Sequence, residues 1–499
     1  MKPSVMTFAM NSVPMPLHPA AFRIPTAARL LRLLAVLVSA IVLGGCASFS
    51  PDGGFAAVEK TVKDRLGKDV QIQWARSDAD QNSIATRVGE LLSKPLTVDD
   101  AVQVALLNNR GLQASFQDLG ISEAELVQAG RLPNPGFSFG RSSQGDEREI
   151  ERGLHFNIAR LIAMPLIGQM EARRFEQTKG MVAISVLTLA ADTRKAYYNA
   201  LAAEQTVRYM QQVMQAANAS AELARRMEQV GNFNKLQRAR EQVFYADASL
   251  NFARAEQAQR ATRERLTRLL GAWGTQTQFT LPERLPDLPK NVMELPDIER
   301  VALLQRLDVQ GARLAAEQTA RNLGLTRTTR FVNVIELGLM RNSSNEAPTQ
   351  RGWEIGFELP LFDWGGARVA RAEAVYMQTV HRAAETAINA RSEVREAYTG
   401  YRSAYDIARH QRDEVVPLNQ RIAEENVLRY NGMLIGVFEL LADARNQIAS
   451  VNGSIQALRD FWLAQADLDM ALVGKPSLAS STGAAAGPVM AAEAAGAPH

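Results

Sequence analysis

The strongest constraint in this sequence is a long proline-free stretch, which runs from Pro165 to Pro282. We predict that its first part, residues 166–230, is one helix roughly 100 Å long, followed after a turn at Gly231–Asn232 by a shorter return helix over 233–271. A repeat of about 3.5 residues is typical of helices that wind around one another. Small and apolar residues follow that repeat inside the long helix: Ala196, Ala200, Ala203, Val207, Met210, Met214, Ala217, Ala221 and Ala224.

The same pattern occurs again about 200 residues later, which indicates an internal duplication. The second copy repeats the apolar seam with Ala397, Tyr401, Ala404, Ala408, Val415, Leu418 and Ile422. Three further matches keep the same order: Val104-Ala-Leu-Leu107 with Val301-Ala-Leu-Leu304, Arg194-Lys-Ala-Tyr197 with Arg395-Glu-Ala-Tyr398, and Gly231 with Gly432.

Each copy is expected to contain an opening helix, a long helix and a closing helix. The first opening helix begins behind Thr97, a residue type that caps helix N-termini. Together the opening and closing helices match the long helix in length, so we expect them to lie end to end beside it. The expected spans are 98–130, 166–230 and 233–271 in the first copy, and 297–327, 366–431 and 433–473 in the second.

Two strands are expected between the opening and the long helix of each copy. Alternation of apolar with polar residues, typical of a strand with two different faces, marks them. The expected strands lie around Phe137 and Phe139, over Leu154–Ile158, over Phe331–Met340 and over Trp353–Leu359. The polar stretches Ser142–Glu151 and Arg341–Gly352 are predicted to be loops.

The single cysteine, Cys46, ends an N-terminal segment with the features of a secretory signal. Arg29 and Arg32 precede the short apolar run Leu33–Leu43, and Gly44-Gly45 lead into the cysteine. This ending resembles a bacterial lipobox, which implies cleavage before Cys46 and attachment of lipid to its thiol. Ala47 follows, and the absence of Asp there resembles lipoproteins of the outer membrane. An ordinary signal peptide with an incidental cysteine is the alternative.

The predicted domain organisation has six parts. Net charge is only +3, and the sequence has no long run of one sign, so a nucleic-acid partner is not expected. The parts are a lipoprotein signal peptide (1–45), an N-terminal anchor segment (46–96) with a short helix near Phe55–Leu66, a first repeat (97–272), a linker (273–296), a second repeat (297–474) and a disordered Ala/Gly-rich tail (475–499).

Four segments follow one another along the duplicated chain: Leu96-Thr-Val-Asp-Asp-Ala101, Gln128-Ala-Gly-Arg-Leu-Pro-Asn-Pro135, Leu359-Pro-Leu-Phe-Asp-Trp-Gly365, and Tyr430-Asn-Gly432 followed by Phe438-Glu-Leu-Leu-Ala-Asp-Ala-Arg445. In this order they resemble the TolC-type outer-membrane efflux proteins. The resemblance implies a mainly α fold with a small transmembrane β part. It further implies a homotrimer, in which helices form an α-barrel and four strands per chain form a twelve-stranded β-barrel.

The resemblance also implies a function and partners. Such a protein is a passive exit duct for drugs, metal ions or other small molecules, anchored by lipid in the outer membrane with a large periplasmic portion. It works with a periplasmic adaptor (membrane fusion) protein and an inner-membrane pump. A non-channel coiled-coil lipoprotein scaffold or adhesin is the alternative, and protein secretion remains open as the duct's role.

The same resemblance directs attention to the periplasmic tip. Glu439 and Asp443, four residues apart on one helix, are the candidates for a ring of carboxylates at a gate. The turns at Gly231–Asn232 and Asn431–Gly432 are the candidates for adaptor docking. Alternatively, the two carboxylates are solvated surface groups, and the two glycines only terminate helices.

No enzyme, cofactor or metal site is predicted. Gly136-Phe-Ser138-Phe-Gly140 fits the G-x-S-x-G pattern, with Asp146 and His155 behind it, but the strand-to-helix turn of a nucleophile elbow is missing. The sequence contains neither a phosphate-binding loop of the P-loop type nor a His-Glu-x-x-His motif. Its histidines are dispersed: His18, His155, His381, His410 and His499.

Overall fold

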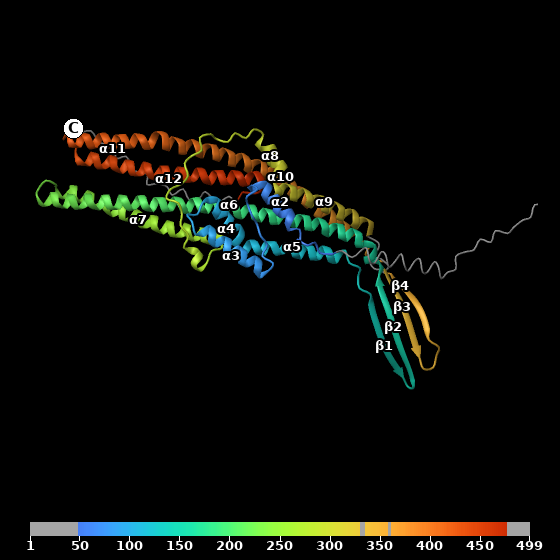
Figure 1. Ribbon diagram of the computed structural model, residues 1–499. Coiled ribbons are helices and arrows are strands. Elements are labelled where there is room, and N and C mark those ends of the chain that lie inside the picture. The colour runs from blue at the N-terminus through green and yellow to red at the C-terminus, as the bar shows by residue number, and fades with distance from the viewer. Residues whose placement is uncertain (1–47, 330–334, 358–360, 477–499) are drawn as a thin grey trace, which may run out of the picture.

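The computed structural model describes residues 48–329, 335–357 and 361–476. Cys46, the predicted signal peptide and nearly all of the predicted tail therefore lie outside the described residues. The described chain forms a long bundle of helices, and a four-stranded sheet projects from one end of that bundle (Figure 1). This mainly helical architecture with a small antiparallel sheet agrees with the predicted fold class.

Both halves of the chain contain the predicted order of helices and strands. The N-terminal segment forms α2 (Phe55–Leu66) and α3 (Asp78–Leu92). The first repeat contains α4 (Val98–Asn108), α5 (Arg110–Ala129), β1 (Gly136–Gln144), β2 (Glu147–Asn157), α6 (Ile158–Gln229) and α7 (Lys235–Leu270). After the short 3-10 helix η1 (Gly274–Thr277), the second contains α8 (Ile298–Gln305), α9 (Leu307–Thr329), β3 (Ile335–Ser344), β4 (Gln350–Phe357), α10 (Gly366–His410), the π-helical turn η2 (Gln411–Val415), α11 (Val416–Asn431) and α12 (Val437–Val473).

The predicted apolar seam of the first long helix is confirmed. Every member from Ala196 to Ala224 is buried or partly buried on α6. Near the distal end, Val213 and Ala217 of α6 pack with Ala248 of α7, as small side chains at a 3.5-residue repeat allow.

The shorter helices lie end to end beside the long one, as predicted, with α5 and α7 along opposite halves of α6 (Figure 1). Polar side chains at the break between α4 and α5 close the end of α7. Asn109 Nδ2 donates to the Leu269 carbonyl over 2.9 Å, and Asn108 Nδ2 donates to the Gly271 carbonyl over 2.8 Å. These bonds satisfy carbonyls that a helix C-terminus leaves unpaired.

At the break between α8 and α9, a buried arginine likewise donates a hydrogen bond to a carbonyl near the end of a neighbouring helix. Arg306 is 1% exposed, and its Nη1 donates to the Ala471 carbonyl near the end of α12. Its Nη2 lies 2.7 Å from carboxylate oxygens of both Asp308 and Glu393. Burial alone would lower the pKa of Arg306, but hydrogen bonds and charge attraction to Asp308 and Glu393 outweigh it and raise the pKa.

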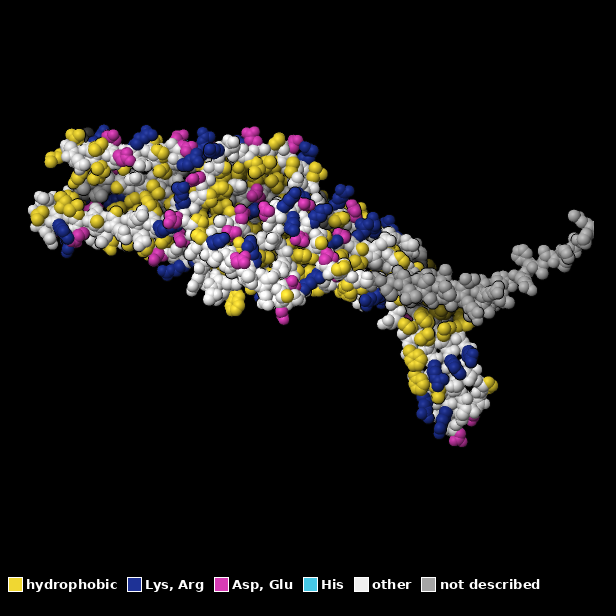
Figure 2. Space-filling view, viewed as in Figure 1, with side chains coloured by type: hydrophobic (Ala, Val, Ile, Leu, Met, Phe, Trp, Pro, Cys, Tyr) yellow, Lys and Arg dark blue, Asp and Glu magenta, His cyan; other side chains and the backbone are white. Residues whose placement is uncertain are grey.

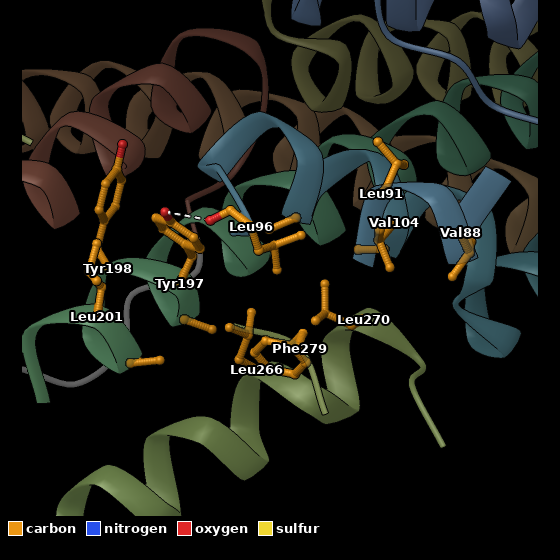
Figure 3. Close-up of a cluster of buried hydrophobic side chains, with 14 of the residues drawn as sticks. Val88, Leu91, Leu96, Val104, Tyr197, Tyr198, Leu201, Leu266, Leu270 and Phe279 are labelled. Atoms are coloured by element: carbon orange, nitrogen blue, oxygen red, sulfur yellow. Dashed lines mark hydrogen bonds between the residues drawn. The ribbon is translucent and has the colours of Figure 1, made fainter. Parts of the chain in front are cut away.

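A buried cluster where the N-terminal helices meet α6 and α7 fixes the middle of the bundle (Figure 3). Leu96, Leu266 and Phe279 converge there on the Tyr197 ring, and the Tyr197 hydroxyl donates to the Leu96 carbonyl over 2.9 Å. Burial raises the pKa of Tyr197, so its hydroxyl remains a donor. The chain that joins the two repeats contributes Phe279 to this core and so is tied to the bundle.

Several helix predictions were wrong in detail. Each opening helix, expected as one element over 98–130 and 297–327, is divided in two, because the backbone is extended at Asn109 and at Arg306. α6 begins at Ile158, before the expected residue 166, because the Asn157 side chain accepts a hydrogen bond from Arg160 N and starts the helix directly after β2. Pro165 therefore lies inside α6. The second long helix is interrupted by η2, which ends two residues before Pro417 and contains Asp413, whose carbonyl Pro417 cannot pair with because it has no N–H.

The sheet is antiparallel throughout, in the order β1-β2-β3-β4. The predicted polar loops were too long. β1 and β2 continue to the pair Gln144 and Glu147, and the tight turn between them has Gly145 at φ +64°. Likewise, β3 and β4 reach Ser344 and Gln350. Strand residues Phe331–Val334 and Glu358–Leu359 of the prediction lie outside the described residues. None of the described helices has both the length and the apolar character needed to cross a bilayer.

Candidate functional site

The turns at the distal end of the bundle do not have the same backbone geometry. Gly231 has φ +81°, the left-handed conformation that closes many helices. Its counterpart in sequence, Gly432, has φ −81°, and the left-handed residue is the following one, Met433, at φ +57°. Gly432 still caps the C-terminus of α11, but the left-handed conformation belongs to the residue after it. Met433 is 94% exposed, so an apolar side chain projects from this turn.

The two candidate gate carboxylates have different surroundings. Glu439 lies exposed in the first turn of α12. Asp443, one turn later, is partly buried, and its carboxylate accepts a hydrogen bond from the Asn426 side chain on α11. Asn426, which the sequence pattern did not single out, thus holds Asp443 against the neighbouring helix and leaves Glu439 as the freely accessible carboxylate of the two.

A link between the two helical hairpins lies next to this site, between α7 and α12. Glu241 of α7 is 1% exposed and accepts a hydrogen bond of 2.8 Å from the Ser220 hydroxyl on α6. Arg445 of α12 lies 4.0 Å from the other oxygen of Glu241, with its guanidinium 4.4 Å from the centroid of the Phe244 ring. Arg445 therefore ties the second repeat to the first near the tip, where Ile448 of α12 also packs against Val213, Ala217 and Ala248.

The sheet at the other end of the molecule has two chemically distinct faces. In an antiparallel sheet, directly paired residues project from the same face. The register places apolar residues and arginines together on the first face: Phe137, Phe139, Ile150, Leu154, Phe156, Ile335, Leu337, Leu339, Trp353, Ile355 and Phe357, with Arg141, Arg148, Arg152, Arg341 and Arg351. We call it the apolar-arginine face.

The opposite face, the carboxylate face, carries no lysine or arginine within the described strands. It contains small and polar residues, one apolar residue, Met340, together with His155 and the glutamates Glu147, Glu149, Glu151, Glu336 and Glu354. One face of the sheet is thus suited to an apolar environment and the other to water and cations.

Ser138 and His155 meet on the carboxylate face. Ser138 Oγ lies 2.9 Å from His155 Nε2, although both side chains are exposed. Asp146 lies in the turn beyond the strands, roughly 26 Å along the chain from Ser138 at about 3.3 Å per residue. The structure therefore brings together the serine and histidine of the sequence pattern but not its acid, so the triad geometry is absent.

No group of three or more His, Cys, Asp or Glu side chains suited to a metal ion occurs within residues 48–329, 335–357 and 361–476. Neither of the described histidines of the helices, His381 and His410, lies in such a group.

Known proteins resemble this chain chiefly in structure. No protein-family model matches it. The cobalt-zinc-cadmium resistance protein CzcC of Cupriavidus metallidurans is 24% identical over 282 residues, a match that spans 54% of this chain and 64% of CzcC.

Three solved structures have similar architecture. The outer-membrane channel CmeC of Campylobacter jejuni has a TM-score of 0.64 at 17% identity, and the match covers 75% of this chain and 85% of CmeC. The outer-membrane protein VceC of Vibrio cholerae has a TM-score of 0.64 at 14% identity, covering 76% and 96%. The open MtrE channel of Neisseria gonorrhoeae has a TM-score of 0.63 at 19% identity, covering 76% and 89%.

The chain has the fold of the outer-membrane channels. The predicted resemblance to TolC-type proteins is therefore confirmed for the fold. In this fold the sheet lies at one end of the molecule and the distal helical turns lie at the other.

Proposed function

We propose that this protein is the outer-membrane exit duct of a tripartite efflux system, in which it passively conducts small solutes out of the periplasm. The observation that carries the proposal is the two-faced sheet at the end of a long helical bundle. An apolar-arginine face suits contact with lipid, and a carboxylate face suits a water-filled passage.

Three copies of the chain would complete the passage. The sheet of one chain has open edges at β1 and β4, and unpaired strand edges are unfavourable within lipid. Pairing β4 of each copy with β1 of the next would give a closed twelve-stranded barrel, the arrangement that the resemblance implies.

The helical part supports the same assembly. Large apolar side chains remain exposed along the distal halves of both hairpins, where a neighbouring copy would cover them. On α6 and α7 they include Leu223, Val230, Leu236, Val243 and Leu250, and on α11 they include Leu418, Ile422, Val427 and Leu428. These faces favour an α-barrel over an isolated bundle.

The partners follow from this arrangement. The duct itself has no motif for ATP hydrolysis, so an inner-membrane pump must supply energy, and a periplasmic adaptor would connect the two. The turns at Gly231–Asn232 and Asn431–Gly432, with the exposed Met433, are the docking points we propose for that adaptor. Acylation of Cys46 would anchor each copy in the outer membrane.

Metal ions are the cargo class that the similarity to CzcC favours. A carboxylate-lined passage is compatible with cations, because fixed negative charge raises their local concentration. Without a metal-binding cluster in the described residues, the duct would pass ions and leave their selection to the pump.

Single-channel recording of the lipidated, full-length protein in planar bilayers tests the proposal. Discrete openings from a trimer, whose mass is determined in detergent, are expected. A closed tip could hide them, so a variant with Glu439→Ala and Asp443→Ala is recorded in parallel and should show more frequent opening or a weaker cation preference. A monomer without conductance in either form would favour the rival function, a coiled-coil scaffold or adhesin.

Lipid attachment has its own test. Intact-mass measurement of the membrane-extracted protein should give the mass of a chain cleaved before Cys46 plus its acyl groups, and Cys46→Ser should lose both changes. Cleavage without added lipid mass would leave only an ordinary signal peptide.

A further inference from the structure

Three arginines form a row across the apolar-arginine face. Arg152 of β2 is the direct partner of Arg341 of β3, and Arg341 is the direct partner of Arg351 of β4. Directly opposed side chains have Cβ atoms about 5 Å apart, and like charges in such pairs destabilise a sheet. Arg141 and Arg148 lie on the same face, nearer the turn between β1 and β2.

Within the described part of the chain, no acidic side chain offsets this repulsion. Among the described residues, none of these five guanidinium groups takes part in a salt bridge or a side-chain hydrogen bond. All five side chains are exposed. The glutamates of the strands project from the opposite face, so they are separated from the arginines by the sheet itself.

The row also has a defined position relative to the apolar residues. Leu154, Leu339 and Trp353 form the adjacent row on the same face, on the side toward the helices. Figure 2 shows hydrophobic side chains on the part of the sheet nearest the bundle and Lys or Arg side chains farther toward the turns. An exposed tryptophan at the edge of an apolar band is typical of the boundary between hydrocarbon and headgroups, so the arginine row lies at headgroup level.

We infer that the row Arg152, Arg341 and Arg351 binds the phosphate groups of phosphorylated lipids in the outer leaflet. Planar guanidinium groups form paired hydrogen bonds with phosphate oxygens, and a phosphate between two opposed arginines removes their repulsion. The inference rests on the proposed function, because the apolar-arginine face meets lipid only if the sheet is part of a membrane channel. It adds that lipids with exposed phosphate groups are bound specifically at this face.

The test compares lipid binding of the full-length protein in detergent, measured by native mass spectrometry. The probes are lipid A with two phosphate groups and the same lipid after removal of both. The wild-type protein should retain the phosphorylated form more tightly. A variant with Arg152→Gln, Arg341→Gln and Arg351→Gln should bind it roughly 100-fold more weakly, since each of the three basic residues near a charged surface contributes about fivefold.

A matched control replaces three exposed arginines of the helical part and linker, Arg87, Arg260 and Arg284, with glutamine. This control should bind phosphorylated lipid A as the wild type does. Inorganic phosphate at equal concentration should not displace the lipid, because the adjacent apolar row holds its acyl chains.

Equal binding of the two lipids by the wild-type protein overturns the inference even if the variants fail to fold. Equal weakening by the row variant and the control also overturns it, as does displacement by inorganic phosphate. Conductance in bilayers of zwitterionic lipid separates this result from the proposed function: a conducting protein indifferent to lipid phosphate refutes only the arginine site.

Discussion

Asn109 and Arg306 occupy the same place in the two halves of the chain, each at the break between two consecutive helices. Asn109 donates to the Leu269 carbonyl at the end of α7, and Arg306 donates to the Ala471 carbonyl near the end of α12. The duplicated architecture therefore uses two different side chains for one task. The neutral amide needs no counterion, whereas the buried guanidinium needs Asp308 and Glu393.

Replacing Arg306 with methionine should destabilise the protein by about 3 kcal/mol, because the partly buried carboxylate of Glu393 loses its fully buried partner. Combining Arg306→Met with Glu393→Leu should recover part of that loss. Denaturant unfolding in detergent, followed by circular dichroism, measures both. Arg87→Met is the control, since the pair Arg87 and Glu90 is exposed and should contribute less than about 1 kcal/mol. An equal loss of unfolding free energy in Arg87→Met would show that the burial of Arg306 does not account for its contribution to stability.

The two distal turns should respond differently to alanine, although their glycines correspond in sequence. Gly231→Ala should destabilise the turn by about 1 kcal/mol, because alanine at φ +81° is strained. Gly432→Ala should be tolerated, since φ is −81° there and the added Cβ would make only ordinary contacts, at 3.5 Å or more. Met433→Gly should stabilise its turn.

Protease susceptibility of the distal turns in the detergent-solubilised protein measures these effects, because cleavage requires local opening. Faster cleavage in Gly432→Ala than in Gly231→Ala would contradict the observed backbone conformations.

Periodicity was sufficient to predict most of the helices and the apolar parts of the strands. The seam from Ala196 to Ala224 and the alternation around Phe137 and Phe139 both result from one side of an element being buried or apolar. The outer parts of β1 and β2 were missed for a specific reason. The outer end of β1, Arg141–Gln144, is polar throughout, and in β2 arginines alternate with glutamates, so a search for apolar–polar alternation takes both for a polar loop.

The contacts at the tip and at the helix breaks could not be predicted from periodicity. Glu241 and Arg445 meet only because the second hairpin packs beside the first, and no local pattern encodes that placement. Arg306 lies in an otherwise helical sequence without proline or glycine beside it. The π-helical turn did have a local signal in Pro417, whose missing N–H removes one hydrogen bond from the helix, although α6 continues through Pro165.

Removing Arg445 should loosen the tip. The Arg445→Ala variant loses its contact with Glu241 and with the Phe244 ring, which join α12 to α7. We expect open probability in planar bilayers to rise roughly 2–30-fold, the range of a typical coupling energy. Arg429→Ala, which removes an exposed charge near the same turn, is the matched control. A similar rise in both variants would assign the effect to net charge at the tip and not to the link.

The two faces of the sheet should control different properties of the channel. Glu151→Gln, Glu336→Gln and Glu354→Gln together remove negative charge from the carboxylate face, which we propose lines the passage. Cation preference should therefore fall, because fixed charge beside a narrow aqueous path enriches counterions. The reversal potential in a potassium chloride gradient reports this directly and should move toward zero.

Arg341→Gln is the control on the other face. Arg341 directly precedes Asn342, the partner of Glu151, so it lies at nearly the same level of the sheet as Glu151. Its side chain projects from the opposite face, away from the proposed passage. It should leave the reversal potential unchanged. A shift in selectivity from Arg341→Gln, with none from the three glutamate substitutions, would mean that the arginines line the passage and the carboxylate face points outward. The assignment of the two faces would then have to be reversed, because both faces cannot border the same aqueous path.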